Sequence, residues 1–340
     1  MNLINSINYG YSHDNDVAQD RSQWMAKLND NTPLSSLSIP GTHDTMSLGW
    51  GGVIAQTQSK SLKNQLLSGI RYLDIRLGAY PNDPDLLYSY HGFIYLHSTF
   101  TNILEIVTSF LKSNPSETIL MRIKQEHTTK PDNVFLSLLN KFLQNPKYSN
   151  YVYKNKKQNN PFLKELRGKI LILQNFGGKI EWMPYPASFY IQDDYWLKSI
   201  WELYSKWEKV KDYLYKANQS FLSGEHEKFI NYLSGTGGCF PYFVASGHVQ
   251  PNTCSPQLPT GLTEPKFHSY YPDFPRVKLN SGIVMIFFQG TDILTMNYIK
   301  KFNPSYVGII VADFPGQGLI NSVIDVNFNK KKALTNNCCA

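Results

Sequence analysis

Short apolar runs alternate with longer amphipathic segments along most of this 340-residue chain, and this alternation limits the fold more than any other feature. Several runs are almost continuously apolar, which is typical of parallel strands that are buried on both faces. The segments between them have helical apolar spacing, and Pro115 and Pro304 stand where two of these helices should stop. The pattern predicts an α/β fold, a distorted parallel (β/α)8 TIM-type barrel in a single domain.

The predicted strands are short segments bounded by turn-forming or charged residues. They cover 37–43, 71–78, 86–92, 118–126, 169–175, 189–193, 228–235, 282–288 and 306–314. For 228–235, periodicity alone does not separate a strand from the end of a helix. Residues 247–281 interrupt the alternation because they are rich in Pro, Ser, Thr and Gly, and we expect a loop insertion near the active-site face.

We expect residues 1–22 to form a lead segment, residues 23–328 to form the barrel, and residues 329–340 to form a basic tail that ends in cysteines. The tail does not match the four-residue prenylation box. No basic start is followed by an apolar run, and the longest apolar runs are too short to cross a bilayer. The sequence therefore predicts a soluble protein without a visible export signal, and leaves its location open. Whether Cys239 and Cys254 pair also stays open, because two cysteines define no framework.

Ionisable residues recur where the predicted strands end. In chain order these residues are His43, Asp44, Asp74, Arg76, His91, Lys124, Glu126, Asp193 and Asp313. The C-terminal ends of the strands of a parallel barrel converge on one face, where sites are built from several strands. Because an unpaired ionisable residue is costly to bury, packing alone does not explain this repeated placement. The pattern predicts a site on that face.

The residue types at these positions suit the cleavage of a phosphodiester. Two histidines can act as base and acid, because an imidazole titrates near neutral pH. An arginine offers a planar, permanent positive charge to phosphoryl oxygens, and carboxylates can fix the tautomer of an imidazole and stabilise its cationic form. The formal net charge of +7 favours an anionic partner such as a phospholipid surface. No basic face with interleaved aromatic residues is evident, so we do not expect nucleic acid as a partner.

Motifs along the chain resemble phosphatidylinositol-specific phospholipase C of the bacterial type. They are, in order, SIPGTHD, YLDIR, YHG, NPSETILMRIK, GKILIL, YIQDDY and VGIIVADF. SIPGTHD and NPSETI at this separation are specific together, and the resemblance runs from about residue 24 to residue 328. The sequence around the 247–281 insertion looks closer to fungal-like members than to compact bacterial ones. The resemblance implies a PLC-like phosphodiesterase barrel.

The resemblance also implies roles for individual residues. His43 resembles the general base that takes the proton of the inositol 2-hydroxyl, whose oxygen then attacks phosphorus to give inositol 1,2-cyclic phosphate. His91 resembles the general acid that protonates the departing diacylglycerol oxygen. Arg76 would stabilise charge on the non-bridging oxygens, with Asp74 beside it in the sequence. Asp313 would orient His43, and Asp44 would support His91.

Substrate contacts follow from the same resemblance. Lys124 and Asp193 would hydrogen-bond inositol hydroxyls, and Tyr195 would offer a ring face to the sugar. The implied partner is phosphatidylinositol, with glycosylated phosphatidylinositol anchors as candidate further substrates. We expect a monomer that touches the membrane surface transiently, and Trp50 and Phe240 are candidate membrane contacts.

Two further details bear on the site. In metal-dependent relatives a carboxylate replaces the arginine at position 76 and calcium stabilises the charge, so Arg76 implies an enzyme without a metal or other cofactor. Where bacterial relatives place an arginine after the fifth strand, this chain has Asn175, which departs from the family pattern. Trp196, Trp201 and Trp207 are predicted to pack on one face of a helix.

Two other functions fit parts of the pattern. A metal-dependent glycerophosphodiester phosphodiesterase would share the barrel and the two histidines, but it would need a divalent cation and more acidic ligands. A catalytically silent barrel that binds inositol lipids would lack a catalytic group, whereas His43, Arg76 and His91 are all present. A chelator test separates the metal-dependent glycerophosphodiesterase from a metal-independent phospholipase C.

Overall fold

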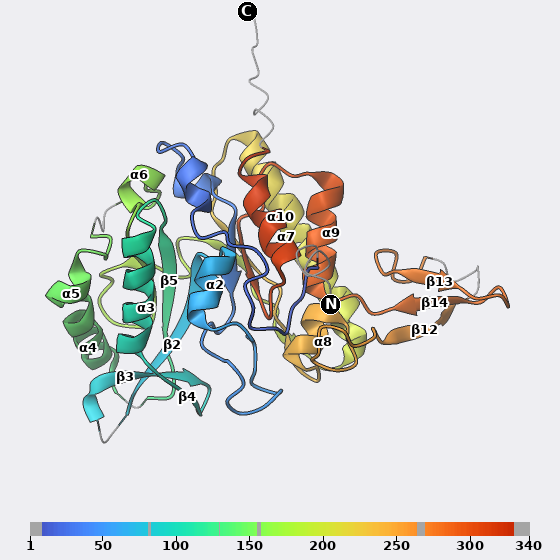
Figure 1. Cartoon of the computed structure of the whole chain (residues 1–340), viewed down its shortest axis with the longest axis horizontal. Coiled ribbons are helices and arrows are strands. Elements are labelled where there is room, and N and C mark those ends of the chain that lie inside the picture. The colour runs from blue at the N-terminus through green and yellow to red at the C-terminus, as the bar shows by residue number, and fades with distance from the viewer. Residues whose placement is uncertain (1–8, 81–82, 129, 155–157, 264–268, 330–340) are drawn as a thin grey trace, which may run out of the picture.

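A curled sheet forms the centre of the computed structural model, which describes residues 9–80, 83–128, 130–154, 158–263 and 269–329 (Figure 1). Its parallel strands lie in the order β7–β6–β5–β2–β1–β15–β10–β8. Their bounds are β1 Ile39–Thr42, β2 Tyr72–Tyr80, β5 Ile119–Gln125, β6 Ile170–Asn175, β7 Met183–Pro184, β8 Tyr190–Gln192, β10 Phe229–Tyr232 and β15 Ile309–Ala312. Within the described ranges no pairing joins β7 to β8. The predicted α/β barrel is therefore confirmed as a distorted one, open along one side.

Burial on both faces explains why these runs form strands. Every residue of β1, β10 and β15 is buried, as expected for a parallel sheet that is covered by helices. At Gly41 an added Cβ atom would lie only 2.8 Å from the Cβ atom of Tyr72, so glycine is needed for β1 to approach β2. Segment 228–235, for which strand and helix were both open, contains strand β10.

Helices cover the sheet on its outer side (Figure 1). They are α2 Leu62–Ser68, α3 Phe100–Ser113, α4 Asp132–Gln144, α5 Pro146–Ser149, α6 Leu163–Leu166, α7 Leu203–Ser223, α8 Pro241–Ser246, α9 Thr291–Phe302 and α10 Gln317–Val326, with the 3-10 turns η1 Trp24–Lys27, η2 Leu34–Ser36 and η3 Ile200–Glu202. One apolar cluster joins the sheet to α2, α3, α4 and α6, and a second joins it to α7, α8, α9 and α10. Within the described ranges no helix is long and apolar enough to cross a bilayer.

A β-hairpin extends the sheet beyond β2. Strands β3 (Asp83–His91) and β4 (Ile94–Thr99) pair antiparallel, and β3 pairs antiparallel with the long end of β2. Segment 86–92 is therefore a strand as predicted, but it is not one of the parallel barrel strands. The hairpin crosses the end of β2 at the lower edge of Figure 1.

A three-stranded antiparallel arm projects from the helices near α8 (Figure 1, right). It consists of β12 (Pro259–Thr263), β14 (Val284–Phe287) and β13 (Arg276–Lys278), in that order. The prediction of a plain loop for 247–281 was wrong in part, because β12 and β13 lie within it. Segment 282–288 was predicted as a barrel strand, and it is instead the middle strand of the arm. A short apolar run indicates a strand but does not identify the sheet that it joins.

A shorter two-stranded pair lies beside the barrel. It joins β9 (Trp196–Leu197) to β11 (Thr236–Gly237), in the chain that follows β8 and β10. The prediction that three tryptophans pack on one helix face was wrong for Trp196 and Trp201, which are exposed. Both precede α7, which begins at Leu203, and only Trp207 is a buried helical residue.

The two ends of the chain and the cysteines were also the subject of predictions. Most of the predicted tail, 330–340, and the first part of the lead segment, 1–8, lie outside the described residues. Cys239 is buried and Cys254 is exposed, and both are free thiols.

Candidate active site

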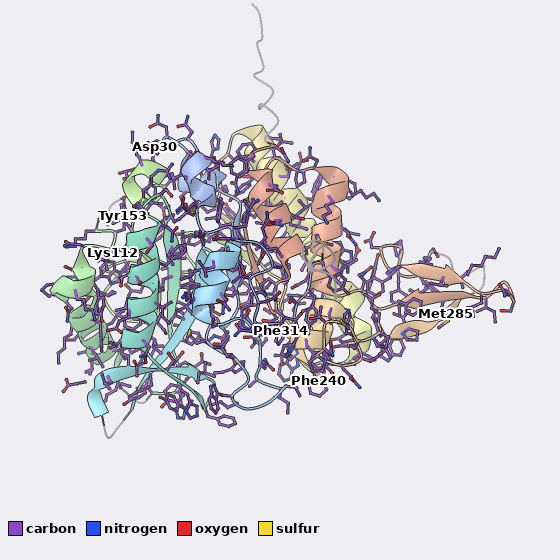
Figure 2. All side chains as sticks on the ribbon, in the orientation of Figure 1. Asp30, Lys112, Tyr153, Phe240, Met285 and Phe314 are labelled. Atoms are coloured by element: carbon purple, nitrogen blue, oxygen red, sulfur yellow. The ribbon has the colours of Figure 1, made fainter. Side chains whose placement is uncertain are left out.

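A cavity of about 280 Å³ opens at the C-terminal ends of the barrel strands. Its walls are His43, Thr57, Arg76, His91, Arg122, Lys124, Asp193, Tyr195, Ser234, Gly235, Thr236, Pro241 and Asp313. The predicted residues Asp44 and Asp74 do not line it, but they are buried and contact residues that do. Trp50 and Phe240 are not part of the wall. Figure 2 labels Phe240 at the lower edge of the molecule, below α8, and Phe314, which follows Asp313, nearer the centre.

Strand register brings the first histidine to its carboxylate. Thr42 of β1 lies opposite Ala312 of β15, so the next residues, His43 and Asp313, leave the sheet side by side. The side-chain amide of Gln58 donates to the backbone carbonyls of His43 at 2.8 Å and Ala312 at 3.0 Å, which joins the ends of β1 and β15. The backbone of His43 is therefore held in place beside that of Asp313.

The tautomer of His43 follows from its two partners. Its Nε2 atom lies 2.7 Å from Nη2 of Arg76, and its Nδ1 atom lies 2.8 Å from Oδ1 of Asp313. Because an arginine only donates hydrogen bonds, Nε2 must be the accepting nitrogen. Nδ1 then carries the proton and donates it to Asp313. Burial is the largest cause, and the Arg76 charge the second, of a His43 pKa well below its usual value. His43 is therefore a neutral imidazole that can accept a proton at Nε2.

The low pKa of His43 can be tested by NMR titration of its imidazole. Replacement of Arg76 by Gln should raise the pKa of His43, because a nearby positive charge disfavours the protonated ring. In the unchanged protein the ring should stay neutral from pH 7 down to a pH well below 6.5. Arg21→Gln is the control, since Arg21 pairs with Asp325 outside the cavity wall. A His43 pKa near 6.5 in the unchanged protein, or no rise in the Arg76 variant, would contradict this assignment.

The second histidine reaches the cavity from the hairpin. Nδ1 of His91 lies 2.6 Å from Oδ2 of Asp44, whose side chain is almost fully buried. Asp44 adopts a φ of 39°, a left-handed conformation that aspartate tolerates better than most residues. Its backbone N–H donates to Oδ2 of Asp74 at 3.0 Å, which locks the turn after β1 onto β2. Each histidine thus has a carboxylate of its own.

Carboxylates surround the guanidinium of Arg76. The closest atom pairs are Nη2 to Asp74 Oδ2 at 3.2 Å, Nη1 to Asp44 Oδ2 at 3.5 Å and Nη1 to Glu126 Oε2 at 3.6 Å. Burial alone would raise the pKa of Asp74, but the charges of Arg122 and Arg76 lower it below its usual range. The site therefore holds a fixed positive charge beside His43, with the ionised carboxylate of Asp74 behind it.

Arg122 is a wall residue that sequence reasoning missed. Register places Arg122 opposite Asp74 and Lys124 opposite Arg76 on the neighbouring strands β5 and β2. Its Nη1 atom donates to Asp74 Oδ1 at 2.8 Å. The signal was present in the sequence, because residues two apart on a strand face the same side and Lys124 was already a candidate. Glu126, noted at the end of its strand but given no role, contacts both Arg76 and Lys124.

A buried lysine anchors the wall that carries Asp193 and Tyr195. Nζ of Lys206, on α7, donates to the carbonyls of Asp194 at 2.8 Å and Tyr232 at 2.7 Å. Burial lowers the pKa of Lys206 to about 8. The segment after β8 is thereby tied to the end of β10, which explains how exposed side chains there hold a fixed place on the rim.

The family model and two similar proteins point to the same protein family. The family described as "Phosphatidylinositol-specific phospholipase C, X domain" matches residues 30–176. The 1-phosphatidylinositol phosphodiesterase of Listeria monocytogenes is 37% identical over 239 residues, which cover 64% of this chain and 69% of the relative. That of Staphylococcus aureus strain Newman is 29% identical over 276 residues, which cover 72% of this chain and 86% of the relative.

Solved structures agree with the sequence matches. The structure titled as phosphatidylinositol-specific phospholipase C from Listeria monocytogenes superposes with a TM-score of 0.64 at 28% sequence identity. The superposition covers 92% of this chain and 99% of that one. The likeness thus extends over the whole barrel, well beyond the matched X domain.

Proposed function

This chain belongs to the phosphatidylinositol-specific phospholipase C family, and from that membership we propose that it cleaves phosphatidylinositol by intramolecular phosphotransfer. The products are diacylglycerol and inositol 1,2-cyclic phosphate. One observation carries the mechanism: two histidines, each paired with its own buried carboxylate, line one cavity with an arginine in contact with the first. A phosphodiester needs a base, an acid and a positive charge, and this cavity offers all of them.

The first step transfers the phosphoryl group within the substrate. Nε2 of His43 takes the proton of the inositol 2-hydroxyl, and that oxygen forms a bond to phosphorus as the bond from phosphorus to the glycerol oxygen breaks. Protonated His91 gives its proton to the departing oxygen. Asp313 stabilises the imidazolium that forms at His43, as Asp44 does for the charged form of His91. Because nucleophile and phosphorus are in one molecule, no bound water is needed in this step.

In this proposal the positive charge of Arg76 stabilises the negative charge on the non-bridging oxygens. The carboxylates of Asp44, Asp74 and Glu126 already lie within ion-pair distance of Arg76, so they have a cation partner. The substrate phosphate would compete with them and with His43 Nε2 for the guanidinium N–H groups. The arrangement supports a mechanism in which arginine, rather than a metal ion, offsets the developing charge.

The proposal predicts that a chelator leaves the activity unchanged. Phosphatidylinositol in mixed micelles should release diacylglycerol at the same rate with and without EDTA. A rate that falls in EDTA and returns with a divalent cation would favour the metal-dependent glycerophosphodiesterase. Lipid binding without diacylglycerol release in either condition would identify a silent inositol-lipid-binding barrel.

The inositol ring would contact the outer wall of the cavity. Lys124 and Asp193, which line the cavity, would hydrogen-bond its hydroxyls, and Tyr195, with a half-exposed ring, would cover one face. Glycosylated phosphatidylinositol anchors are a second candidate substrate, since they share the same diester. Release of an anchored protein from vesicles tests that extension.

Exposed aromatic side chains on segments that adjoin residues of the cavity wall support transient contact with the membrane. Trp50 is 51% exposed, on the loop between β1 and α2, and Phe240 is 43% exposed just before α8. Phe93, at the hairpin turn two residues after His91, is 80% exposed. Aromatic side chains at such positions can enter the headgroup layer and bring the cavity to the lipid.

The double variant Trp50→Ala, Phe240→Ala tests this contact. We expect binding to phosphatidylinositol vesicles to fall by about tenfold or more, since burying one large apolar side chain contributes roughly 1.5–3 kcal/mol. Turnover of a soluble short-chain substrate below its critical micelle concentration should not change. Phe302→Ala is a matched control, because this exposed residue ends α9 at the opposite end of the barrel. Equal vesicle binding by the double variant and the control would refute the contact.

A further inference from the structure

Arg122 is part of the cavity wall and has no role in the mechanism above. It lies in the middle of β5, and its side chain is 9% exposed. A buried guanidinium keeps its charge and needs partners for its five N–H groups, because unpaired buried donors are costly. The partners of Arg122 therefore show what the remaining edge of the guanidinium is free to do.

Three contacts hold one side of the Arg122 guanidinium. Nη1 donates to Asp74 Oδ1 at 2.8 Å and to the Tyr232 hydroxyl at 3.1 Å, and Nε donates to Asn175 Oδ1 at 2.8 Å. The centre of the guanidinium lies 4.7 Å from the Tyr185 ring centroid and 5.9 Å from that of Tyr232. These contacts fix the position and the plane of the group before any ligand binds.

The other side of the guanidinium faces the cavity. Among the residues that the structure describes, Nη2 has no hydrogen-bond partner, and Nη2 is not among the buried atoms that lack one. Arg122 lines the cavity together with Lys124 and Asp193. Nη2 thus presents two donors to a ligand, from a group that its other contacts hold rigidly.

Charge decides which ligand group these donors suit. Asp74, at 2.8 Å, offsets the charge of Arg122, and the Tyr185 and Tyr232 rings beside the guanidinium hold its plane. Arg122 therefore offers directed donors more than net charge, which suits a neutral hydroxyl group. Asn175, at which this chain departs from the resembled pattern, serves here as the acceptor that holds Nε.

We propose that Arg122 is a substrate-binding residue whose Nη2 edge donates hydrogen bonds to a hydroxyl of the inositol ring. This inference rests on the proposed function, because it assumes that the cavity takes an inositol headgroup. Arg122 would then determine specificity in addition to pairing with Asp74. The two roles differ in one respect: only a direct contact depends on the presence of a particular hydroxyl.

The test measures binding of myo-inositol and its monodeoxy analogues by NMR titration of the whole protein. For the unchanged protein, one deoxy analogue should bind about tenfold or more weakly than myo-inositol, because it leaves a charged donor unpaired. In Arg122→Lys, which keeps a charge near Asp74 but lacks the second N–H₂ group, the same analogue and myo-inositol should bind equally. Arg167→Lys is the control, since Arg167 donates to backbone carbonyls away from the cavity.

The outcomes separate this inference from the proposed function. Retention of the hydroxyl dependence in Arg122→Lys would overturn the inference, and so would failure of the unchanged protein to bind myo-inositol. If Arg122→Lys does not fold, Asn175→Ala keeps the inference testable, because it removes the acceptor at Nε and should weaken the same hydroxyl dependence. Phosphatidylinositol turnover by the unchanged protein, measured separately, tests the proposed function whatever the titrations show.

Discussion

Replacement of His91 by Gln should lower turnover of phosphatidylinositol by about 10²- to 10⁴-fold, the usual contribution of a general acid. The same variant should cleave an analogue with a nitrophenolate leaving group almost as fast as the unchanged protein does. Nitrophenolate is a stable anion and needs no proton as it departs, whereas a glycerol oxygen does. The measurement compares the rates of both substrates in both proteins.

His43→Gln is the matched variant for this experiment. Its turnover should fall by about 10²- to 10⁴-fold on both substrates, because the inositol hydroxyl must lose its proton whatever the leaving group is. The contrast between the variants assigns one role to each histidine. If both variants lost activity equally on the nitrophenyl substrate, His91 would not be the acid. If His43→Gln kept its activity there, His43 would not be the base.

Replacement of Arg76 should have the next largest effect. Arg76→Gln removes the fixed charge that faces His43, and we expect kcat to fall by about 10²- to 10³-fold, as when one donor to a developing oxyanion is lost. Arg76→Lys should recover only part of the rate, because an ammonium group does not reproduce the planar fork of the guanidinium. KM should change much less than kcat, since the charge on the phosphoryl oxygens develops in the transition state.

Two features make the Arg76 experiment interpretable. Arg21→Gln removes a cation whose partner, Asp325, is not part of the cavity wall, and should leave kcat unchanged. Melting curves should accompany the kinetics, because Arg76 also contacts buried Asp44 and Asp74. A rise in KM with kcat intact would mean that Arg76 binds the ground state and the transition state equally, and would contradict its place in the mechanism.

Much of the site could be predicted from the sequence because its geometry follows from parallel strands. Residues just beyond the ends of such strands share one face, so the strand pattern alone is enough to group His43, Arg76 and Asp313. The pairing of His43 with Asp313 needs more, since it depends on β1 and β15 being neighbours. Strand order arises from contacts between distant segments, and an apolar run does not encode which neighbour it takes.

His91 shows a correct position reached for the wrong reason. The sequence suggested the end of a parallel strand, whereas His91 ends an antiparallel strand that folds over the end of β2. Segment 282–288 shows the opposite case, in which a strand was predicted correctly but belongs to the projecting arm. In both cases local composition indicated a strand, and long-range pairing decided its direction and its sheet.

Arg122 and the exposed aromatic residues mark what local patterns did not reveal. Arg122 was within reach, because the period of two that made Lys124 a candidate applies to it equally. The exposure of Phe93 and Trp196 was not, since it depends on how the β3–β4 hairpin and the β9–β11 pair pack in the folded molecule. Exposure depends on how the whole surface is assembled, whereas the burial of strand residues can largely be predicted from their apolar sequence.

In the proposed mechanism the inositol 2-hydroxyl, rather than water, attacks phosphorus. Phosphorus NMR of the purified protein with phosphatidylinositol in mixed micelles, in the presence of EDTA, tests it most directly. We predict that the signal of inositol 1,2-cyclic phosphate appears first and that any inositol 1-phosphate follows later from it. Inositol 1-phosphate as the first product, without the cyclic signal, would mean that water attacks directly, and would contradict the account.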